Sequence, residues 1–377
     1  MFRFLMLIAS LFLLTYSLPS IEKQLNGSEY GQTIEQIGTQ INELKDNPEA
    51  TAAINTIFDH VQKLLQQLNL QLDQVPKESE QQEHEKLELK APAQQLFSIH
   101  NVELGSPRDE IEHNLGQANR VSVNEYGTNW YAYHNNYQDF FMIMYDGKNM
   151  AAGLYTNQDL ISSSNGIKMG SSKADVRGKL GEPLSGIQKG LTIYQFQKDA
   201  DYDVFNIDHS YVTVFYDKHE NNTVTAMQLI SKELEDKKNG FYTEASQELK
   251  EGFEYQMFDL TNAARVMHHL PVLTWDDHVR TTARKHSADM AENQYFDHTN
   301  LQGESPFDRM KEDNIVFHLA GENLAYGQFS SIFAHEGLMN SLGHRENILK
   351  QGYKYLGVGV AFNSESHPYY TQNYYAK

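Results

Sequence analysis

The feature that most restricts the fold of this chain is an internal repeat with a period of about 65 residues. The segments "IHNVELGSPRDEIEHNLGQANR" (99–120) and "SNGIKMGSSKADVRGKLGEPLS" (164–185) share a Gly-Ser pair, an Ile or Val, a Leu and a final Gly at matching positions. In each copy a strand-like run precedes Gly-Ser, the serine is placed to cap a helix, and the final Gly is placed to end it. Because each copy is too small to bury a core of its own, the sequence predicts a doubled α+β module over 96–232.

Strands rich in aromatic residues follow each predicted helix. The runs "FFMIMYDGK" and "YVTVFYDKHE" align so that Tyr145-Asp146 matches Tyr216-Asp217. The aromatic residues of the first copy are Trp130, Tyr131, Tyr133, Phe140 and Phe141. They could form a ligand-binding face or the packed core of a sheet, and the general preference of aromatic residues for strands favours the core.

The N-terminal part carries signals for export. An apolar run over 4–18 follows Arg3, as in a secretory signal, and it is short for a membrane-spanning helix. We therefore expect 1–20 to be a signal peptide or a signal anchor, with 4–18 as the membrane tether in the second case. Apolar residues then recur at steps of three and four over 30–75, which predicts a helical hairpin or stalk that acts as a spacer or as a self-association surface. The polar stretch 76–95 is expected to be a linker.

Charge and cysteine content narrow the classes of function. The 377-residue chain has a formal net charge of −19 and no cysteine. An acidic surface repels phosphate backbones, so nucleic acid is not an expected partner. A chain without cysteine has no disulfide, thiolate nucleophile or zinc ribbon, and an exported chain of this kind is typical of a bacterial envelope. Any metal must be held by His, Asp or Glu.

The last third of the chain holds the candidate site. We expect a linker helix over 233–255 and a final domain over 256–377. His286 falls on the apolar face of a predicted helix, where a hydrogen-bonded core histidine is favoured over a ligand. The candidate site residues are His298 in "YFDHTN", Glu322 in "AGENLA" and His344 in "GHRENIL".

The ordered motifs "NAAR", "FDHT", "GENLA", "MNSLGHRENIL" and "YLGVGVAF" give this region a family resemblance. Residues 256–377 resemble the CAP superfamily (cysteine-rich secretory proteins, antigen 5 and pathogenesis-related 1 proteins) in its cysteine-free bacterial form. The doubled module is similar to the N-terminal domain that accompanies CAP domains in Gram-positive bacteria. The resemblance implies an α+β protein whose C-terminal domain is an α-β-α sandwich, with helices on both faces of a small antiparallel sheet and a cleft that carries two histidines and two acids.

Carried over by motif, the three candidate residues take the places of the two cleft histidines and of the first acid. The second acid is missing, because Ser341 stands at its position and Leu338 replaces the tryptophan that precedes it in many eukaryotic relatives. Glu336 lies nearby at the wrong spacing. This departure weakens any mechanism that needs a pair of carboxylates.

Two interpretations of the cleft follow from its chemistry. Neutral imidazoles of His298 and His344 could hold Zn²⁺, with Glu322 orienting an imidazole or activating a metal-bound water. Two ligands give weak binding that is completed by water and lost as the histidines protonate below about pH 6.5. In the alternative, the three residues form a hydrogen-bonded network that only fixes the loops.

One zinc motif can be excluded. "HEGLM" at 335–339 begins like the zincin motif, but a methionine stands where the second histidine ligand is required. We expect structural roles for Asn262 and Arg265, which would pin the first helix of the domain to the sheet, and for Asn323 with Gly321, which would shape a turn.

Three functions remain. We favour a non-enzymatic, envelope-associated protein that binds a cell-wall polymer, a lipid or a protein partner, since the fold alone does not assign an activity. The second is a metal-dependent hydrolase with Glu322 as base. The third is a structural protein that oligomerises through 30–75.

Overall fold

The computed structural model describes residues 87–189, 192–198, 200–238 and 240–377. The expected signal segment (1–20), the helical stalk (30–75) and most of the linker (76–95) lie outside this part. Within it, none of the helices combines the length and the apolar character that crossing a membrane requires.

The N-terminal module is built on one seven-stranded antiparallel sheet of order β2-β3-β4-β5-β11-β10-β9. Its strands are β2 (Arg120–Val123), β3 (Asn129–Asn135), β4 (Gln138–Tyr145), β5 (Ala151–Thr156), β9 (Tyr202–Ile207), β10 (Ser210–Asp217) and β11 (Thr223–Ser231). The last strands of the two sequence copies, β5 and β11, pair with each other, with Leu154 opposite Leu229. The two copies therefore share one sheet and do not form two separate domains.

The two helices of this module lie where the repeat predicts them. They are α4 (Arg108–Leu115) and α5 (Lys173–Leu180), and each ends at a glycine of positive φ, Gly116 and Gly181. The short strands that precede them, β1 (Phe97–Ile99) and β6 (Ile161–Ser163), pair with each other.

The predicted serine caps were wrong by one position. The residue that caps α5 is Ser172, whose hydroxyl accepts the Asp175 amide at 3.1 Å, while α4 begins after Pro107 without a side-chain cap. The serine of the second Gly-Ser pair, Ser171, instead accepts the amide of Lys168 and closes the preceding turn. Because Ser171 and Ser172 are adjacent, the sequence does not show which of them caps α5.

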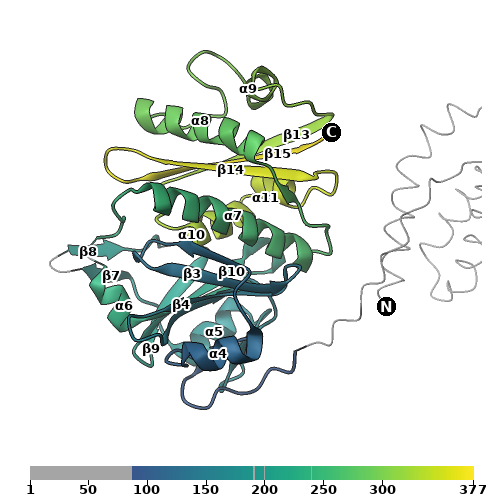
Figure 1. The fold of residues 1–377 in the computed structure, drawn as a ribbon. Helices are drawn as coiled ribbons and strands as arrows, with labels where there is room; N and C mark the ends of the chain where they lie inside the picture. Colours follow the sequence, from purple (N-terminus) through teal and green to yellow (C-terminus); the bar gives the residue numbers. More distant parts are fainter. Residues whose placement is uncertain (1–86, 190–191, 199, 239) are drawn as a thin grey trace, which may run out of the picture. The chain divides into compact units, whose positions relative to one another are not determined.

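The C-terminal module is a sandwich around a four-stranded sheet of order β12-β14-β15-β13. Its elements are α7 (Gln247–Met267), β12 (Thr274–Trp275), α8 (Asp277–Asn293), α9 (Pro306–Glu312), β13 (Leu319–Tyr326), α10 (Ser331–Asn340), α11 (Leu342–Ile348), β14 (Tyr355–Phe362) and β15 (Pro368–Ala376). Helices α8 and α9 cover one face of the sheet, and α7, α10 and α11 cover the other (Figure 1). The sheet is antiparallel except for the short β12, which pairs with β14 in parallel.

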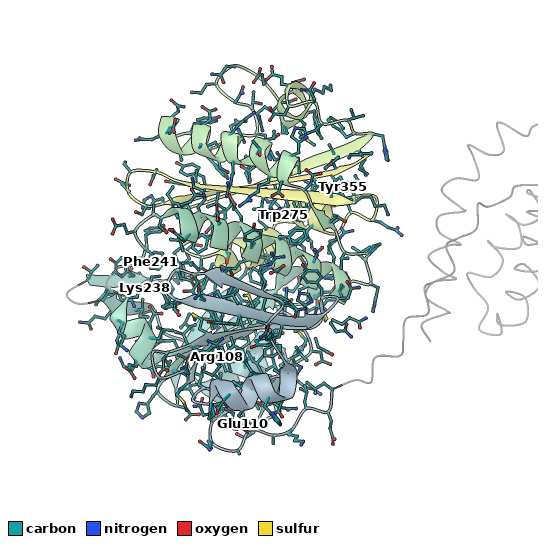
Figure 2. The ribbon with its side chains drawn as sticks, in the orientation of Figure 1. Arg108, Glu110, Lys238, Phe241, Trp275 and Tyr355 are labelled. Carbon is teal, nitrogen blue, oxygen red and sulfur yellow. The ribbon has the colours of Figure 1, made fainter. Side chains whose placement is uncertain are left out.

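The helix layer α7/α10 is shared by both modules. One hydrophobic cluster joins Trp130, Phe140 and Met142 of the seven-stranded sheet to Met257 and Ile332 on these helices. Neighbouring residues of the same strands, such as Phe141 and Ile143, face the opposite way and form a second cluster beneath α4 and α5; this alternation is the period of two of a β-strand. The aromatic strands are therefore sheet core, as the sequence favoured, and side chains fill the space between the layers (Figure 2).

Helix α7 joins the two modules without a break. The expected start of the last domain, residue 256, falls inside this helix, and the segment expected as one linker helix contains α6 (Lys232–Lys237), a loop and the first turns of α7. A Cβ on Gly252 would lie 1.9 Å from the carbonyl oxygen of Val123 on β2. Only glycine lets the helix approach the sheet edge this closely, because no flexible side chain is available to move aside.

Three smaller elements complete the N-terminal module. The hairpin of β7 (Gly186–Lys189) and β8 (Thr192–Gln195) forms its own two-stranded sheet, and a 3₁₀ turn (Lys218–Glu220) follows β10.

Candidate functional site

Two of the three predicted site residues touch each other. His298 lies in the loop between α8 and α9, and its Nδ1 is 2.8 Å from Oε1 of Glu322 on β13. The His298 side chain is 50% exposed, whereas that of Glu322 is only 1% exposed. A buried carboxylate therefore orients an imidazole whose far edge faces solvent.

Arg309 on α9 occupies the second oxygen of this carboxylate. Its Nη2 donates to Oε2 of Glu322 at 2.8 Å, and its Nη1 donates to the carbonyls of His298 and Glu304. The α9 helix that carries it begins with a capping box, in which the Ser305 hydroxyl and the Asp308 carboxylate each accept the other's backbone amide. Both oxygens of Glu322 are thus engaged, and the charge of this buried carboxylate is balanced by a guanidinium.

The third predicted residue lies on the neighbouring helix. His344 is on α11, and its Nδ1 is 2.8 Å from the hydroxyl of Ser341, at the joint between α10 and α11. The pKa of His344 is lowered by burial and, to a smaller extent, by the charge of His298. His344 therefore favours the neutral form at neutral pH.

A set of asparagines fixes α11 against β13. Nδ2 of Asn323 donates to the His344 carbonyl at 3.0 Å, and Nδ2 of Asn347 donates to Oδ1 of Asn323 at 3.0 Å. The predicted turn at Gly321 and Asn323 was therefore wrong, because both residues lie in the middle of β13. A Cβ at Gly321 would lie 2.1 Å from the Tyr353 hydroxyl, so the glycine serves close packing in the strand.

Arg309 and Asn347 were not predicted from the sequence. Ser341 was considered only as the position of a missing acid, although its hydroxyl contacts Nδ1 of His344. The capping sequence "ESPFD" gave the start of α9, but nothing in it indicated which strand Arg309 would reach.

The donors at this site fit a metal only weakly. Within the described residues there is no group of three or more His, Asp or Glu side chains arranged to hold a metal ion. The Nδ1 atoms of His298 and His344 are engaged, so the Nε2 atoms are the nitrogens that would reach a ligand. Glu322 is committed to His298 and Arg309, which leaves two imidazoles with water to complete a coordination shell.

His286, Asn262 and Arg265 all make hydrogen bonds to the backbone of the protein itself. His286 is 1% exposed, and its Nε2 lies 3.0 Å from the Asp297 carbonyl, which confirms the hydrogen-bonded core histidine. Asn262 exchanges two hydrogen bonds with the backbone of Leu273. Arg265 donates to backbone carbonyls before β12 and at the end of α11, and not to the sheet as expected.

The zincin-like segment lies at the junction of the modules. His335 and Glu336 are buried on α10, and Oε1 of Glu336 accepts the hydroxyl of Tyr155 on β5 at 2.6 Å. Burial raises the pKa of Glu336 to about 7 and lowers the pKa of His335 to about 3. The hydrogen bond of Glu336 thus goes to the seven-stranded sheet and not to the cluster around Glu322.

Comparisons with known proteins match both modules. Residues 104–241 match the family model described as CAP-associated N-terminal, and residues 258–374 match the model of the cysteine-rich secretory protein family. The chain is 28% identical over 327 residues to the uncharacterized membrane protein YlbC of Bacillus subtilis, covering 80% of this chain and 89% of that protein. It is 39% identical over 125 residues to the uncharacterized protein YkwD of the same organism, covering 33% of this chain and 48% of that protein.

Two solved structures share the fold over most of the described residues. An extracellular protein containing an SCP domain from Bacillus anthracis superposes with a TM-score of 0.63 at 23% identity, covering 78% of this chain and 99% of that chain. A cysteine-rich secretory protein from Staphylococcus aureus superposes with a TM-score of 0.60 at 16% identity, covering 76% of this chain and 95% of that chain. At these identities the likeness concerns the fold alone.

Proposed function

We propose that this chain, which carries a CAP-associated N-terminal domain followed by a CAP domain of the cysteine-rich secretory protein family, is an exported envelope protein. In this proposal it binds a partner and does not catalyse a reaction. The names of the relatives support this location, since one is called a membrane protein and another an extracellular protein. The partner belongs to the envelope: a cell-wall polymer, a lipid or another protein. The cleft of the CAP domain contributes a weak site for a divalent cation.

The observation that carries the proposal is the burial and hydrogen bonding of the Glu322 carboxylate. A general base must reach the water from which it takes a proton, and here the Glu322 side chain is 1% exposed, with one oxygen 2.8 Å from His298 and the other 2.8 Å from Arg309. The position of the second acid is Ser341, whose hydroxyl is a poor base and already contacts His344. The cleft therefore supports binding better than hydrolysis.

A weak cation site follows from the two imidazoles. The lowered pKa of His344 keeps that ring neutral at neutral pH, which is the form that binds a metal. Glu322 fixes the ring of His298 through Nδ1, so that Nε2 is presented in one orientation. A bound Zn²⁺ would supply a positive charge able to attract a carboxylate or phosphate of the partner.

Calorimetric titration of the full chain with Zn²⁺ at pH 7.5 tests the site. We expect saturable binding that disappears in the double variant His298→Ala, His344→Ala and persists in the control His278→Ala, which removes a histidine from the start of α8. Equal binding in the double variant would place the metal elsewhere and refute the proposed cleft.

A second measurement separates binding from catalysis. The Zn²⁺-loaded full chain is incubated with peptide, ester and glycan substrates, beside the variant Glu322→Gln. We expect no turnover from either protein. Turnover that is lost in Glu322→Gln while the variant keeps its fold and its Zn²⁺ affinity would establish the hydrolase instead.

A further inference from the structure

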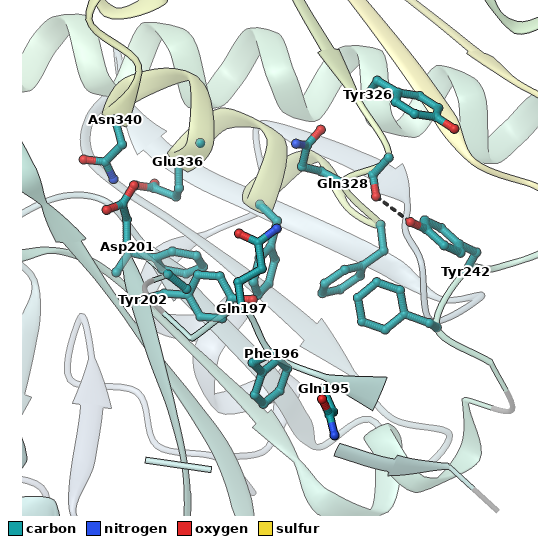
Figure 3. Close-up of a pocket in the computed structure, with 17 residues that line it drawn as sticks. Gln195, Phe196, Gln197, Asp201, Tyr202, Tyr242, Tyr326, Gln328, Glu336 and Asn340 are labelled. Carbon is teal, nitrogen blue, oxygen red and sulfur yellow. Dashed lines mark hydrogen bonds between the residues drawn. The ribbon is translucent and has the colours of Figure 1, made fainter. Parts of the chain in front are cut away.

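A second candidate site lies at the junction of the two modules, away from the histidine cleft. A cavity of about 410 Å³ opens there, within the range of about 300–1,000 Å³ typical of small-molecule sites. Its walls come from residues 195–197 and 200–202 of the N-terminal module, from residues 241–242, and from the part of the CAP domain between 326 and 340 (Figure 3). The cavity therefore exists only because the modules pack together.

Aromatic rings form much of its wall and are held in place by one another. Tyr202 meets Phe333 edge-on at 5.1 Å between ring centres, and Phe196 meets Tyr202 edge-on at 6.0 Å. On the other side, the Phe329 and Phe241 ring centres are 4.5 Å apart. Because the rings are contributed by both modules and already contact each other, their apolar faces are positioned before any ligand arrives.

The charges of the lining argue for a neutral ligand. The described lining residues include no Lys or Arg, so there is no counter-charge for an anion. Its two acids are already partnered: Asp201 lies 3.6 Å from Nζ of Lys218, and Glu336 accepts the Tyr155 hydroxyl. A cationic ligand would thus compete with a partner that each carboxyl group already has.

Side-chain amides supply the polar part of the lining. Gln195 and Gln197 are exposed, whereas Gln328 is half-buried and lies beside Tyr242 (Figure 3). Oε1 of Gln328 is buried and has no hydrogen-bond partner within the described part of the chain. A buried acceptor without a donor is costly, so a ligand that carries donors, and that Oε1 reaches when the Gln328 side chain turns, is favoured over an apolar lipid chain.

We infer that this cavity binds a neutral sugar ring of a glycan chain. A sugar presents apolar C–H faces that stack on aromatic rings and hydroxyl groups that both donate to and accept from amides, and one such hydroxyl would donate to Oε1 of Gln328 once that side chain turns toward the cavity. The inference rests on the proposed binding role of the protein, since it names a neutral glycan as the partner, but it does not depend on the cation site in the cleft.

Calorimetry of the full chain with two neutral probes, a β-1,4-linked glucose tetramer and an N-acetylglucosamine tetramer, tests the inference. We expect saturable binding of at least one probe. Phe196→Ala removes one aromatic face and Gln328→Leu removes the buried acceptor, and each should weaken binding roughly 2- to 10-fold. The matched control Phe307→Ala removes a phenyl ring that is 41% exposed on α9 and should leave the affinity unchanged.

The outcomes separate this site from the cleft. Failure of both probes to bind at millimolar concentration overturns the inference, as does unchanged affinity in both cavity variants. Loss of sugar binding in His298→Ala, His344→Ala with retention in Phe196→Ala would move the sugar to the cleft and also overturn it. Zn²⁺ titration of the same proteins reports on the cation site alone, so its result neither supports nor overturns the sugar site.

Discussion

Replacing Glu336 by glutamine should remove part of the pH dependence of folding stability. This carboxyl is 4% exposed at the junction of the modules and accepts the Tyr155 hydroxyl at 2.6 Å. Desolvation raises its pKa from 4.5 to about 7. The folded protein therefore holds this proton more tightly than the unfolded chain does.

The sign and size of the effect follow by linkage. A raised carboxyl pKa contributes stability that is fully present below about pH 4.5 and is lost as the pH rises through about 7, because the folded state must then ionise a buried group. Each unit of difference is worth about 1.4 kcal/mol. Integrated between pH 5 and pH 8, the group should cost the wild-type protein about 2–3 kcal/mol of unfolding free energy.

Urea denaturation followed by tryptophan fluorescence measures this difference. The two tryptophans report on both modules, since Trp130 is buried in the seven-stranded sheet and Trp275 contacts Phe258 of α7 edge-on at 5.2 Å. Glutamine keeps an acceptor for Tyr155 and cannot ionise. We expect the stability of the variant relative to wild type to rise by about 2–3 kcal/mol from pH 5 to pH 8.

Comparison of the two proteins isolates Glu336 from other buried groups, such as Glu125, whose pKa is also raised to about 7 by burial. The reasoning is refuted if the stability curves of wild type and Glu336→Gln run parallel from pH 5 to pH 8. Such a result would mean that Glu336 is already ionised, or hydrated, in the folded protein at the lower pH.

Three other changes have defined outcomes. Gly252→Ala should lower the unfolding free energy by about 1–3 kcal/mol, because its Cβ would lie 1.9 Å from the Val123 carbonyl oxygen; an unchanged melting temperature would contradict the close approach of α7. His335→Leu should make the protein less sensitive to acid, because the lowered pKa of about 3 means that wild type loses stability as the pH falls below 6.5; the gain should reach about 3 kcal/mol near pH 4 in urea denaturation, and no gain would show that the ring is protonated when folded. Ser341→Asp should tighten Zn²⁺ binding roughly 10-fold at pH 8, because a carboxylate in place of a hydroxyl 2.8 Å from His344 makes the imidazole a stronger ligand; calorimetry with unchanged affinity would count against the cation site.

Local signals in the sequence were reliable where the cause is local. The last glycine in each copy of the repeat predicted where α4 and α5 end, because a residue of positive φ is needed there and glycine adopts it without strain. The Val279, Ala283, His286 and Met290 face of α8 is buried as its periodicity predicts. The prediction that Ser171 caps α5 was wrong, and Ser172 is the cap. Either serine could cap the helix, and the conformation of one backbone turn decides between them.

The hydrogen-bond network around the candidate site could not be predicted from local sequence signals. Motif resemblance located His298, Glu322 and His344, but their partners are contributed by other elements: Arg309 by α9 and Ser341 by the joint between two helices. No periodic pattern links residues that meet only when α9 is laid over β13. The assignment of Asn323 to a turn failed for the same reason, since its amide is used to hold α11.

The sequence by itself predicted a doubled α+β module, a C-terminal domain of the CAP type, and a candidate site in which Ser341 stands at the position of the second acid. These follow from motif, periodicity and residue type, which are properties of neighbouring positions. Only the tertiary structure decided that the two modules share one helical layer, that Glu322 is neutralised by Arg309, and that Tyr155 meets Glu336 across 181 residues of chain. Those contacts are set by how the sheets and helices pack, and packing depends on the shapes of surfaces assembled from distant segments.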